Sequence, residues 1–315
     1  MNSSRVLVTG AGGFIGRWSV PALKGLGYET HAVLSSRPRE VPPELDGATV
    51  HRCDLFDDAA VDGLLNRVRP SHLLHFAWIA TPGEYWQSAD NVRWLEASQY
   101  LMQSFAASGG HRTVMAGTCA EYDWSRADVC DEFSTPLADS TAGVPSLYAA
   151  SKIQMHRALA EFAARQRISY AWGRVFFQFG PYEYPQRLVP SVIRHLLRGE
   201  EAPCSEGRQV RAFLHVTDLA EAFVQLLQSA VEGPVNMGSA ERISVAGLIE
   251  KIAQKTPRPD LVRLGAHRSA EEPPLLVPRV ERLYNEVKWR PRRSLDAGLS
   301  ETVSWWRGHL DWQPR

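Results

Sequence analysis

The chain has 315 residues, of which 44% are hydrophobic and 22% charged, and its 35 basic residues balance its 35 acidic ones. This composition is typical of a globular protein with a substantial core, and the zero net charge argues against a nucleic-acid-binding protein. The N-terminal segment has no apolar signal region, and no apolar run is long enough to span a bilayer, so we expect a cytoplasmic protein without a membrane partner. The four scattered cysteines match no metal or redox spacing, and we expect no metal site.

Short apolar runs alternate with longer helical patterns over the first 180 residues. In chain order we expect strands at 5–9, 29–34, 49–53, 72–77, 113–116 and 169–176. Helices are expected between them at 13–26, where Pro21 weakens the pattern, and at 57–69, 88–108 and 148–165. Strands that alternate with helices of this length predict a doubly wound, parallel α/β sheet of the Rossmann type.

The pattern changes after Gly180-Pro181, where prolines become frequent. We expect a strand end that leads into a helix at 215–227, one more strand at 233–238, and helices near 244–254 and 295–308. The Rossmann domain should therefore comprise residues 1–181 and 211–240, and a smaller C-terminal substrate-binding lobe should comprise 182–210 and 241–315. That lobe should lie over the carboxyl ends of the strands, where open α/β folds bind ligands.

A glycine-rich turn, TGAGGFIG, directly follows the first expected strand. Gly10 permits the tight turn, Gly13 lets the backbone approach a pyrophosphate, and Gly16 lets the helix pack closely on the strand. The helix that begins near Phe14 and Ile15 offers free N–H groups to phosphate. Glycines also mark plain turns, but this position between a strand and a helix predicts a dinucleotide-binding site.

The residues at the end of the second expected strand determine whether such a site prefers NAD or NADP. An acidic residue there binds the ribose 2′-hydroxyl of NAD. This chain instead has Ser35, Ser36 and Arg37, followed by Arg39. Hydroxyls and a guanidinium suit a 2′-phosphate, so we expect NADP(H) to be favoured over NAD(H), with a solvated loop arginine as the alternative.

Tyr148 and Lys152 form a Tyr-x-x-x-Lys pattern at the start of the helix expected at 148–165. Residues four apart lie on one face of a helix, so the ammonium can lower the pKa of the tyrosine. The phenol can then exchange a proton with a carbonyl oxygen, which a hydroxyl at Thr118 can also hold. Surface pairs of this kind are frequent, but the position after the fifth strand favours a catalytic set.

Further motifs occur in the order that they have in a known family. They are TGAGGFIG, Asp54-Leu55, Asn91, Thr118 four residues before Tyr122, YAASK, Arg174 with FGP, RAFLHVTD, NMGSAERIS and WRPRRSLDAGLSETVSWW. Over nearly its whole length the chain thus resembles the extended short-chain dehydrogenase/reductases, a family of nucleotide-sugar epimerases, reductases and dehydratases. The resemblance implies that Tyr148 is the acid/base, that Lys152 tunes it and holds the nicotinamide ribose, and that Thr118 hydrogen-bonds the reacting oxygen.

The resemblance also implies a cofactor site and a nucleotide-sugar site. Asp54 resembles the family residue that contacts adenine, and Arg211 and Arg268 match positions that hold the diphosphate, although Arg211 could instead form a surface ion pair. The expected cofactor-binding residues are Gly10, Gly13, Phe14, Ile15, Gly16, Ser35, Ser36, Arg37, Asp54, Leu55, Ala77, Trp78 and Val175. The expected substrate-binding residues are Tyr122, Phe177, Leu188, Val189, Arg211 and Arg268.

Several departures from the family pattern narrow the reaction. Dehydratases carry an acidic pair where this chain has Cys119 and Ala120, so elimination of a hydroxyl is not expected. No histidine follows Gly180-Pro181, which argues against a 3,5-epimerisation. Phe177 replaces a frequent asparagine and Ala212 a frequent aspartate, and either change alters the expected substrate pocket.

These observations favour an NADP-dependent ketoreductase of a nucleotide-linked 4-keto-6-deoxy sugar, because net reduction needs an exchangeable cofactor. The alternative is an NAD-dependent nucleotide-sugar 4-epimerase, which uses the same catalytic residues but retains its cofactor. A non-catalytic cofactor-binding sensor is disfavoured by the intact Tyr148 and Lys152. The resemblance further implies a homodimer formed through the helices at 88–108 and 148–165.

Overall fold

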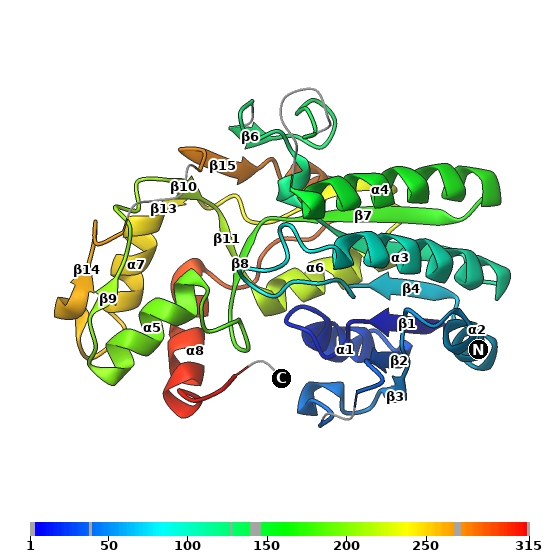
Figure 1. Ribbon diagram of the computed structural model, residues 1–315, viewed down its shortest axis with the longest axis horizontal. Helices are drawn as coiled ribbons and strands as arrows, with labels where there is room; N and C mark the ends of the chain where they lie inside the picture. The colour runs from blue at the N-terminus through cyan, green and yellow to red at the C-terminus, as the bar shows by residue number, and fades with distance from the viewer. Residues whose placement is uncertain (1–3, 38–39, 127, 139–145, 268–271, 314–315) are drawn as a thin grey trace.

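The computed structural model describes residues 4–37, 40–126, 128–138, 146–267 and 272–313. Its centre is a seven-stranded sheet in which all neighbouring strands are parallel (Figure 1). From edge to edge the strands are β12 (Gly233–Met237), β7 (Ser169–Val175), β5 (Arg112–Thr118), β4 (His72–His75), β1 (Arg5–Thr9), β2 (Glu29–Leu34) and β3 (Thr49–Arg52). The strand order reverses between β1 and β4, which confirms the predicted doubly wound Rossmann sheet.

Helices cover both faces of this sheet. One face carries α1 (Gly16–Gly25) and α6 (Val216–Gln228), and the other carries α2 (Asp58–Val68), α3 (Asp90–Ala107) and α4 (Leu147–Gln166). Val6 and Val8 of β1 belong to the first core, whereas Leu7 belongs to the second. Successive strand residues point to opposite faces, so the continuous apolar run of β1 contributes to two cores.

A smaller group of elements lies beyond the carboxyl ends of the sheet strands (Figure 1). Three helices share its apolar core: α5 (Leu188–Arg198), α7 (Val245–Ala253) and α8 (Leu295–Gly308). Short strands form a sheet of β13 (Ile243–Ser244), β10 (Val210–Arg211), β15 (Leu275–Pro278) and β6 (Val129–Cys130), and two pairs, β11 (Phe213–His215) with β8 (Phe177–Phe179) and β14 (Val262–Arg263) with β9 (Ala202–Pro203). Helical turns complete the fold at η1 (Pro43–Leu45), η2 (Cys119–Glu121), η3 (Pro259–Leu261) and η4 (Arg282–Glu286). The proposed lobe boundaries stay a prediction.

The main difference from the expected elements is α5, which the prolines of this region concealed. Pro190 is the third residue of α5. A proline is tolerated in the first turn of a helix because its missing N–H would have no intrahelical partner there. Pro21 lies inside α1 on an exposed position, and α1 begins at Gly16 rather than at Gly13. None of the described helices is long and apolar enough to cross a bilayer.

Two glycines of the TGAGGFIG turn are required by close packing. Gly10 has a φ of +66°, and a Cβ there would lie 2.7 Å from the backbone nitrogen of Ala77. A Cβ on Gly16 would overlap the carbonyl oxygen of Gly10. The turn therefore packs directly against the segment after β4 and against the first turn of α1, as the motif predicts.

A methyl group at Gly16 should destabilise the protein. The overlap with backbone forces a shift, and we expect Gly16→Ala to lower the free energy of unfolding by about 1–3 kcal/mol in urea unfolding. Gly25→Ala is the matched control, because nothing lies within 4 Å of its added Cβ at the end of the same helix. A stability loss in Gly25→Ala equal to that in Gly16→Ala would contradict the packing explanation.

Candidate active site

The structure brings Thr118, Tyr148 and Lys152 together at the carboxyl end of β5. Thr118 is the last residue of β5, and Tyr148 lies in the first turn of α4, whose N-cap Ser146 accepts a hydrogen bond from the N–H of Ala149 at 3.1 Å. The side chain of Thr118 lies close enough to the phenol of Tyr148 to influence its pKa. Lys152 follows one turn later. The three side chains thus share one location, and their catalytic roles remain a prediction.

Lys152 is buried and has two specific contacts. Its Nζ donates a hydrogen bond to the carbonyl oxygen of Ala116 at 2.8 Å and lies 3.8 Å from the centroid of the Trp78 ring. The indole N–H of Trp78 donates to Oδ1 of Asn91 at 2.9 Å, and Asn91 in turn donates to the carbonyl oxygen of Tyr85 at 2.7 Å. Burial lowers the pKa of Lys152 to about 7. Lys152 therefore gains or loses its proton close to neutral pH.

Tyr148 is enclosed by aromatic rings. The rings of Tyr85 and Trp86 meet it edge-on, with centroid separations of 4.9 and 5.9 Å. Burial raises the pKa of Tyr148, and the side chain of Thr118 only partly opposes this effect. Burial is the largest influence on the pKa of Tyr148, and the ammonium of Lys152 is directed to Ala116 and Trp78. The expectation that Lys152 lowers this pKa stays a prediction.

A buried ion pair between Glu121 and Arg174 holds the backbone of Thr118 in place. Nε of Arg174 lies 2.8 Å from Oε2 of Glu121, and both side chains are at most 2% exposed. Glu121 also accepts hydrogen bonds from the N–H of Thr118 at 2.8 Å and from the indole of Trp172 at 2.9 Å. These donors surround the carboxylate, which is fully buried.

Tyr122 belongs to the same buried network. Its hydroxyl donates to Oδ1 of Asn236 at 2.7 Å and accepts from Nη1 of Arg174 at 3.1 Å, and the side chain is 1% exposed. The prediction that Tyr122 contacts substrate is therefore wrong. The residue packs in a core with Cys119 and Phe176 instead, with its one polar atom satisfied by protein groups.

The turn before α1 fits the diphosphate of a dinucleotide. The N-cap of α1 is Ile15, which has no side-chain capping bond, and the first turn holds no acidic residue. No side chain or carboxylate therefore occupies this helix end, although the N–H groups of Arg17 and Trp18 reach the carbonyl oxygens of Gly13 and Ile15 at 3.3 and 3.2 Å. The dipole of the helix favours a phosphate there. Gly13 is exposed and Phe14 is half-buried beside it. Farther along the strand ends, Ala77 and Val175 are buried, where the nicotinamide of such a cofactor is expected.

The adenosine end of the expected site is open to solvent. Ser35, Ser36 and Arg37 are all exposed at the end of β2. Nη1 of Arg52 donates to the carbonyl oxygen of Arg37 at 2.8 Å and so organises this loop, a role that the sequence alone did not indicate. Asp54 is exposed and accepts from the N–H of Phe56 at 3.0 Å. The side chain of Leu55 is buried in the core beneath α2, so only its backbone could face adenine.

Arg211, one of the two arginines expected at the diphosphate site, is buried. Nη2 of Arg211 lies 2.9 Å from Oε2 of Glu272, its guanidinium lies 5.2 Å from the Phe177 ring centroid, and its buried Nε has no partner among the described residues. The first turn of α5, with Leu188 and Val189, has no side-chain cap and no acidic residue. Nη1 of Arg211 donates to the carbonyl oxygens of Val210 and Pro273, so Nε and the N–H groups at the start of α5 are the donors that remain for an anion. Arg39 and Arg268 lie outside the described residues.

Profile comparison assigns the chain to a family. The model of the NAD dependent epimerase/dehydratase family matches residues 6–238. The chain belongs to this family. It is therefore an enzyme of the extended short-chain dehydrogenase/reductase type, as the motifs predicted, built to use a nicotinamide dinucleotide.

Individual family members resemble the chain along its whole length. The chain is 28% identical over 321 residues to the dTDP-4-dehydro-6-deoxy-D-allose reductase of Streptomyces bikiniensis, an alignment that covers 96% of each protein. It is 26% identical over 318 residues to the UDP-glucose 4-epimerase of Corynebacterium glutamicum, covering 92% of each. Its fold matches that of the Thermotoga maritima UDP-glucose 4-epimerase crystallised with UDP-glucose, with a TM-score of 0.82, 20% identity and coverage of 98% of this chain and 100% of that one.

A buried carboxyl group, that of Glu183, follows β8. Glu183 is 8% exposed, its Oε2 has no partner among the described residues, and burial raises its pKa to about 8. Arg187 opposes that rise and lies 5.4 Å from the Tyr85 ring centroid. Sequence patterns did not single out Arg187, which the fold brings to the Tyr85 ring, and that ring in turn meets Tyr148. The described residues contain no cluster of metal-ligating side chains.

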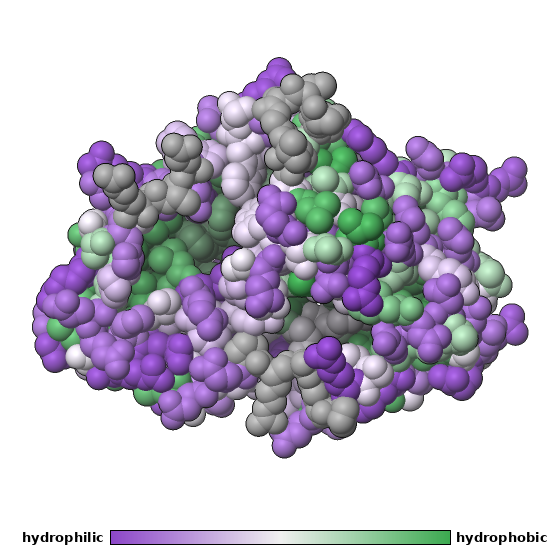
Figure 2. Space-filling view, viewed as in Figure 1, coloured by the Kyte–Doolittle hydropathy of each residue, from purple (hydrophilic) through white to green (hydrophobic). Residues whose placement is uncertain are grey.

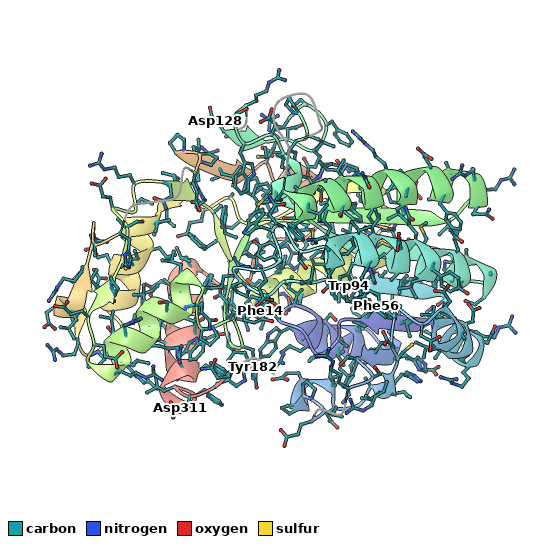
Figure 3. The ribbon with its side chains drawn as sticks, in the orientation of Figure 1. Phe14, Phe56, Trp94, Asp128, Tyr182 and Asp311 are labelled. Atoms are coloured by element: carbon teal, nitrogen blue, oxygen red, sulfur yellow. The ribbon has the colours of Figure 1, made fainter. Side chains whose placement is uncertain are left out.

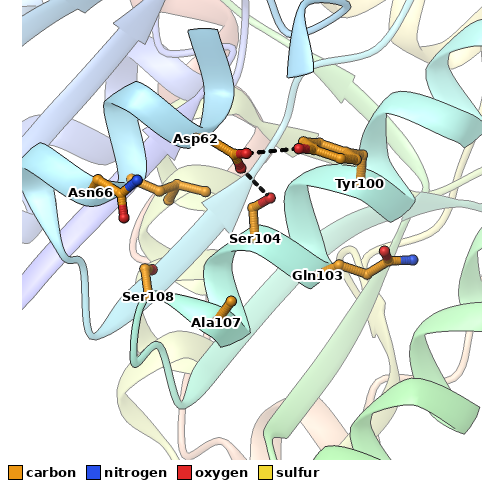
Figure 4. Close-up of a pocket in the computed structure, with 8 residues that line it drawn as sticks. Asp62, Asn66, Tyr100, Gln103, Ser104, Ala107 and Ser108 are labelled. Atoms are coloured by element: carbon orange, nitrogen blue, oxygen red, sulfur yellow. Dashed lines mark hydrogen bonds between the residues drawn. The ribbon is translucent and has the colours of Figure 1, made fainter. Parts of the chain in front are cut away.

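A pocket between α2 and α3 is separate from this site (Figure 4). Asp62 accepts hydrogen bonds there from Tyr100 at 2.8 Å and from Ser104 at 2.7 Å. These donors satisfy the carboxylate and lower its pKa. None of the expected cofactor or substrate residues lines this pocket.

Breaking the Glu121–Arg174 pair should destabilise the enzyme strongly. Glu121→Gln leaves the buried guanidinium without its charge partner, and we expect the free energy of unfolding to fall by about 3–5 kcal/mol. Glu161→Gln is the control, because its pair with Arg165 on α4 is exposed, and we expect a change below about 0.5 kcal/mol. Urea unfolding of both variants measures the difference, and equal effects would argue against the supporting role of the buried pair.

Lys152 should make the stability depend on pH in an identifiable range. Its pKa falls from 10.5 to about 7 on folding, so between these values the unfolded chain binds a proton that the folded protein does not. The free energy of unfolding therefore rises with pH across this range, by at most about 1.4 kcal/mol per pH unit from this group. Lys152→Met should flatten the rise in urea unfolding, whereas Lys251→Met, at a partly exposed position, should not. Parallel profiles of wild type and Lys152→Met would exclude the shift.

Proposed function

We propose that the enzyme is an NADP-dependent ketoreductase of a nucleotide-linked 4-keto-6-deoxy sugar. The observation that carries the proposal is that Thr118 at the end of β5 lies beside Tyr148 in the first turn of α4, with Lys152 one helical turn away. When bound, the cofactor supplies a hydride to the sugar carbon. The protein residues handle the oxygen of the same carbonyl group.

Tyr148 is the residue that we assign to proton transfer. Burial raises its pKa, so the phenol holds its proton at neutral pH and can donate it to an oxygen that gains negative charge. Thr118 hydrogen-bonds that oxygen, and Lys152 holds the nicotinamide ribose. The rings of Tyr85 and Trp86 exclude water from the phenol, which strengthens each polar interaction there.

The residues after Thr118 favour reduction over elimination or double epimerisation. Cys119 and Ala120 occupy the positions of the acidic pair that a dehydratase needs, and both are buried. Burial raises the pKa of the Cys119 thiol, so the thiol stays protonated and is a poor base. No group at these two positions can therefore abstract a proton beside the carbonyl carbon.

The cofactor preference rests on the exposed end of β2. Ser35, Ser36 and Arg37 supply two hydroxyls and a guanidinium in a loop that Arg52 organises, and they include no carboxylate to bind a 2′-hydroxyl. This set favours a 2′-phosphate. NADPH is also the cofactor that a net reduction draws on, and a relative that shares 28% identity is a reductase.

The sugar nucleotide fits the surface between the sheet and the smaller group of helices. Figure 2 shows this surface hollowed beside α5, α7 and β11, with hydrophobic residues on its floor. Arg211 and the uncapped N-terminus of α5 supply donors for a diphosphate, and Phe177 supplies an aromatic face. We further propose a homodimer through α3 and α4, which lie side by side, and a cytoplasmic role in carbohydrate biosynthesis.

A nucleotide-sugar 4-epimerase is the second candidate, favoured by the 26% identity with the Corynebacterium glutamicum enzyme. Both reactions use the same three residues. They differ in cofactor exchange, because an epimerase returns the hydride to its own substrate and shows no net oxidation of NADPH.

The deciding experiment follows nicotinamide absorbance with NADPH or NADH and a panel of nucleotide-linked 4-keto-6-deoxy sugars. We expect NADPH oxidation that Tyr148→Phe reduces at least about 100-fold, the lower end of the range for a lost general acid. Arg37→Ala should weaken NADPH binding about 10-fold without changing NADH binding, since it removes one phosphate-binding guanidinium. Arg165→Ala, at the exposed end of α4, is the control.

Other outcomes separate the alternatives. Sugar interconversion on retained NAD without a net absorbance change identifies an epimerase. Equal losses of NADPH and NADH binding in Arg37→Ala contradict the NADP assignment. Cofactor binding without turnover of any sugar refutes the nucleotide-sugar substrate.

A further inference from the structure

The ammonium of Lys152 lies over the face of an indole that is itself held in place. Its Nζ is 3.8 Å from the Trp78 ring centroid, well within the range of a cation–π contact. The only other ring near this ammonium among the described residues is Trp172, whose centroid is 5.9 Å away. Such contacts strengthen when the cation is desolvated, and Lys152 is 4% exposed.

Trp78 has little freedom to leave this position. Its indole N–H is used by Asn91, which is fully buried and whose amide donates to the carbonyl oxygens of Tyr85 and Ser88. The ring also stacks on Trp94, with centroids 6.4 Å apart and an interplanar angle of 27°. Trp94 in turn contacts Phe56, and Figure 3 shows these two side chains together at the α2–α3 side of the sheet.

We propose that Trp78 is a positioning residue that holds the Lys152 ammonium in the active site through the face of its indole ring, with Asn91 fixing the orientation of that ring. The proposal deepens the proposed function, because Lys152 is the residue that we assign to the cofactor ribose. Trp78 therefore does more than line the nicotinamide site. It keeps the flexible side chain of Lys152 charged and oriented in a site from which water is excluded.

The charges around Lys152 set the direction of the effect. Burial lowers its pKa, and the carboxylate of Glu121 on η2 opposes this. His75 on β4 also faces it, but burial lowers the pKa of that imidazole to about 3, so it is neutral. An electron-rich ring face stabilises the ammonium, as Glu121 does. Loss of the ring should therefore lower the pKa of Lys152 further.

The test measures Lys152 directly by NMR titration of protein with ¹³C-labelled lysine. The chain has five lysines, and the spectrum of Lys152→Met identifies the resonance. We expect Lys152 to titrate near 7 in the wild type, roughly one pH unit lower in Trp78→Leu, and close to the wild-type value in Trp78→Phe, which keeps a ring face. Trp78→Met replaces the leucine variant if that variant does not fold.

Trp94→Leu is the matched control, because it removes a neighbouring ring that stacks on Trp78 without contacting Lys152. We expect it to leave the titration unchanged. An unshifted titration in Trp78→Leu, or an equal shift in Trp94→Leu, overturns the proposal, since either result makes Trp78 an ordinary packing residue.

Turnover provides a separate readout. With an accepted nucleotide sugar, the acidic limb of the kcat/KM profile that follows Lys152 should move down with the NMR titration in Trp78→Leu and be restored in Trp78→Phe. If the wild type turns over no nucleotide sugar, the proposed function fails, while the NMR titration still decides the role of Trp78.

Discussion

The arrangement of the active site depends on the buried ion pair between Glu121 and Arg174. Each charge is removed from water, so each needs all of its partners within the protein. Glu121 meets this need by binding the backbone N–H of Thr118, and Arg174 does so by binding the hydroxyl of Tyr122 and the carbonyl oxygen of Glu132. The pair thereby ties the end of β5 to β7 and places the hydroxyl of Thr118 at the start of α4. The hydroxyl of Thr118 at the end of a strand is thus held in place by a buried network of polar groups.

Burial, rather than attraction between neighbouring charges, sets the protonation states in this site. It raises the pKa of Tyr148 and of the Cys119 thiol and lowers that of Lys152, so that near neutrality the phenol and the thiol are protonated and the amine is close to its titration point. Such a site suits donation of a proton to a carbonyl oxygen. It does not suit abstraction of a proton beside that oxygen. Tyr85 and Trp86 pack against the phenol, and Trp78 packs against the ammonium of Lys152, so aromatic rings border both groups.

Two helix N-termini complete the site, and they illustrate how fold and function are coupled. Neither α1 nor α5 has a side-chain cap or an acidic residue in its first turn. A capping carboxylate would stabilise each helix but compete with a phosphate for the same N–H groups. Omitting the cap at α1 fits a cofactor diphosphate, and omitting it at α5, near Arg211, fits a second one.

The order of strands and helices, the glycine turn and the Tyr148–Lys152 spacing could be read from the sequence, because each depends on residues close together in the chain. The helix α5 was concealed by Pro190, whose harmless position in the first turn is evident only once the helix start is known. Tyr122, which was expected at the substrate, is instead buried by the fold against Asn236. Some contacts join residues that are far apart in the chain, such as Glu121 with Arg174, 53 residues away, or Trp78 with Lys152. The local periodicity of the sequence does not predict them. Only the tertiary structure decided them, because burial and partner choice arise when distant segments pack and exclude water.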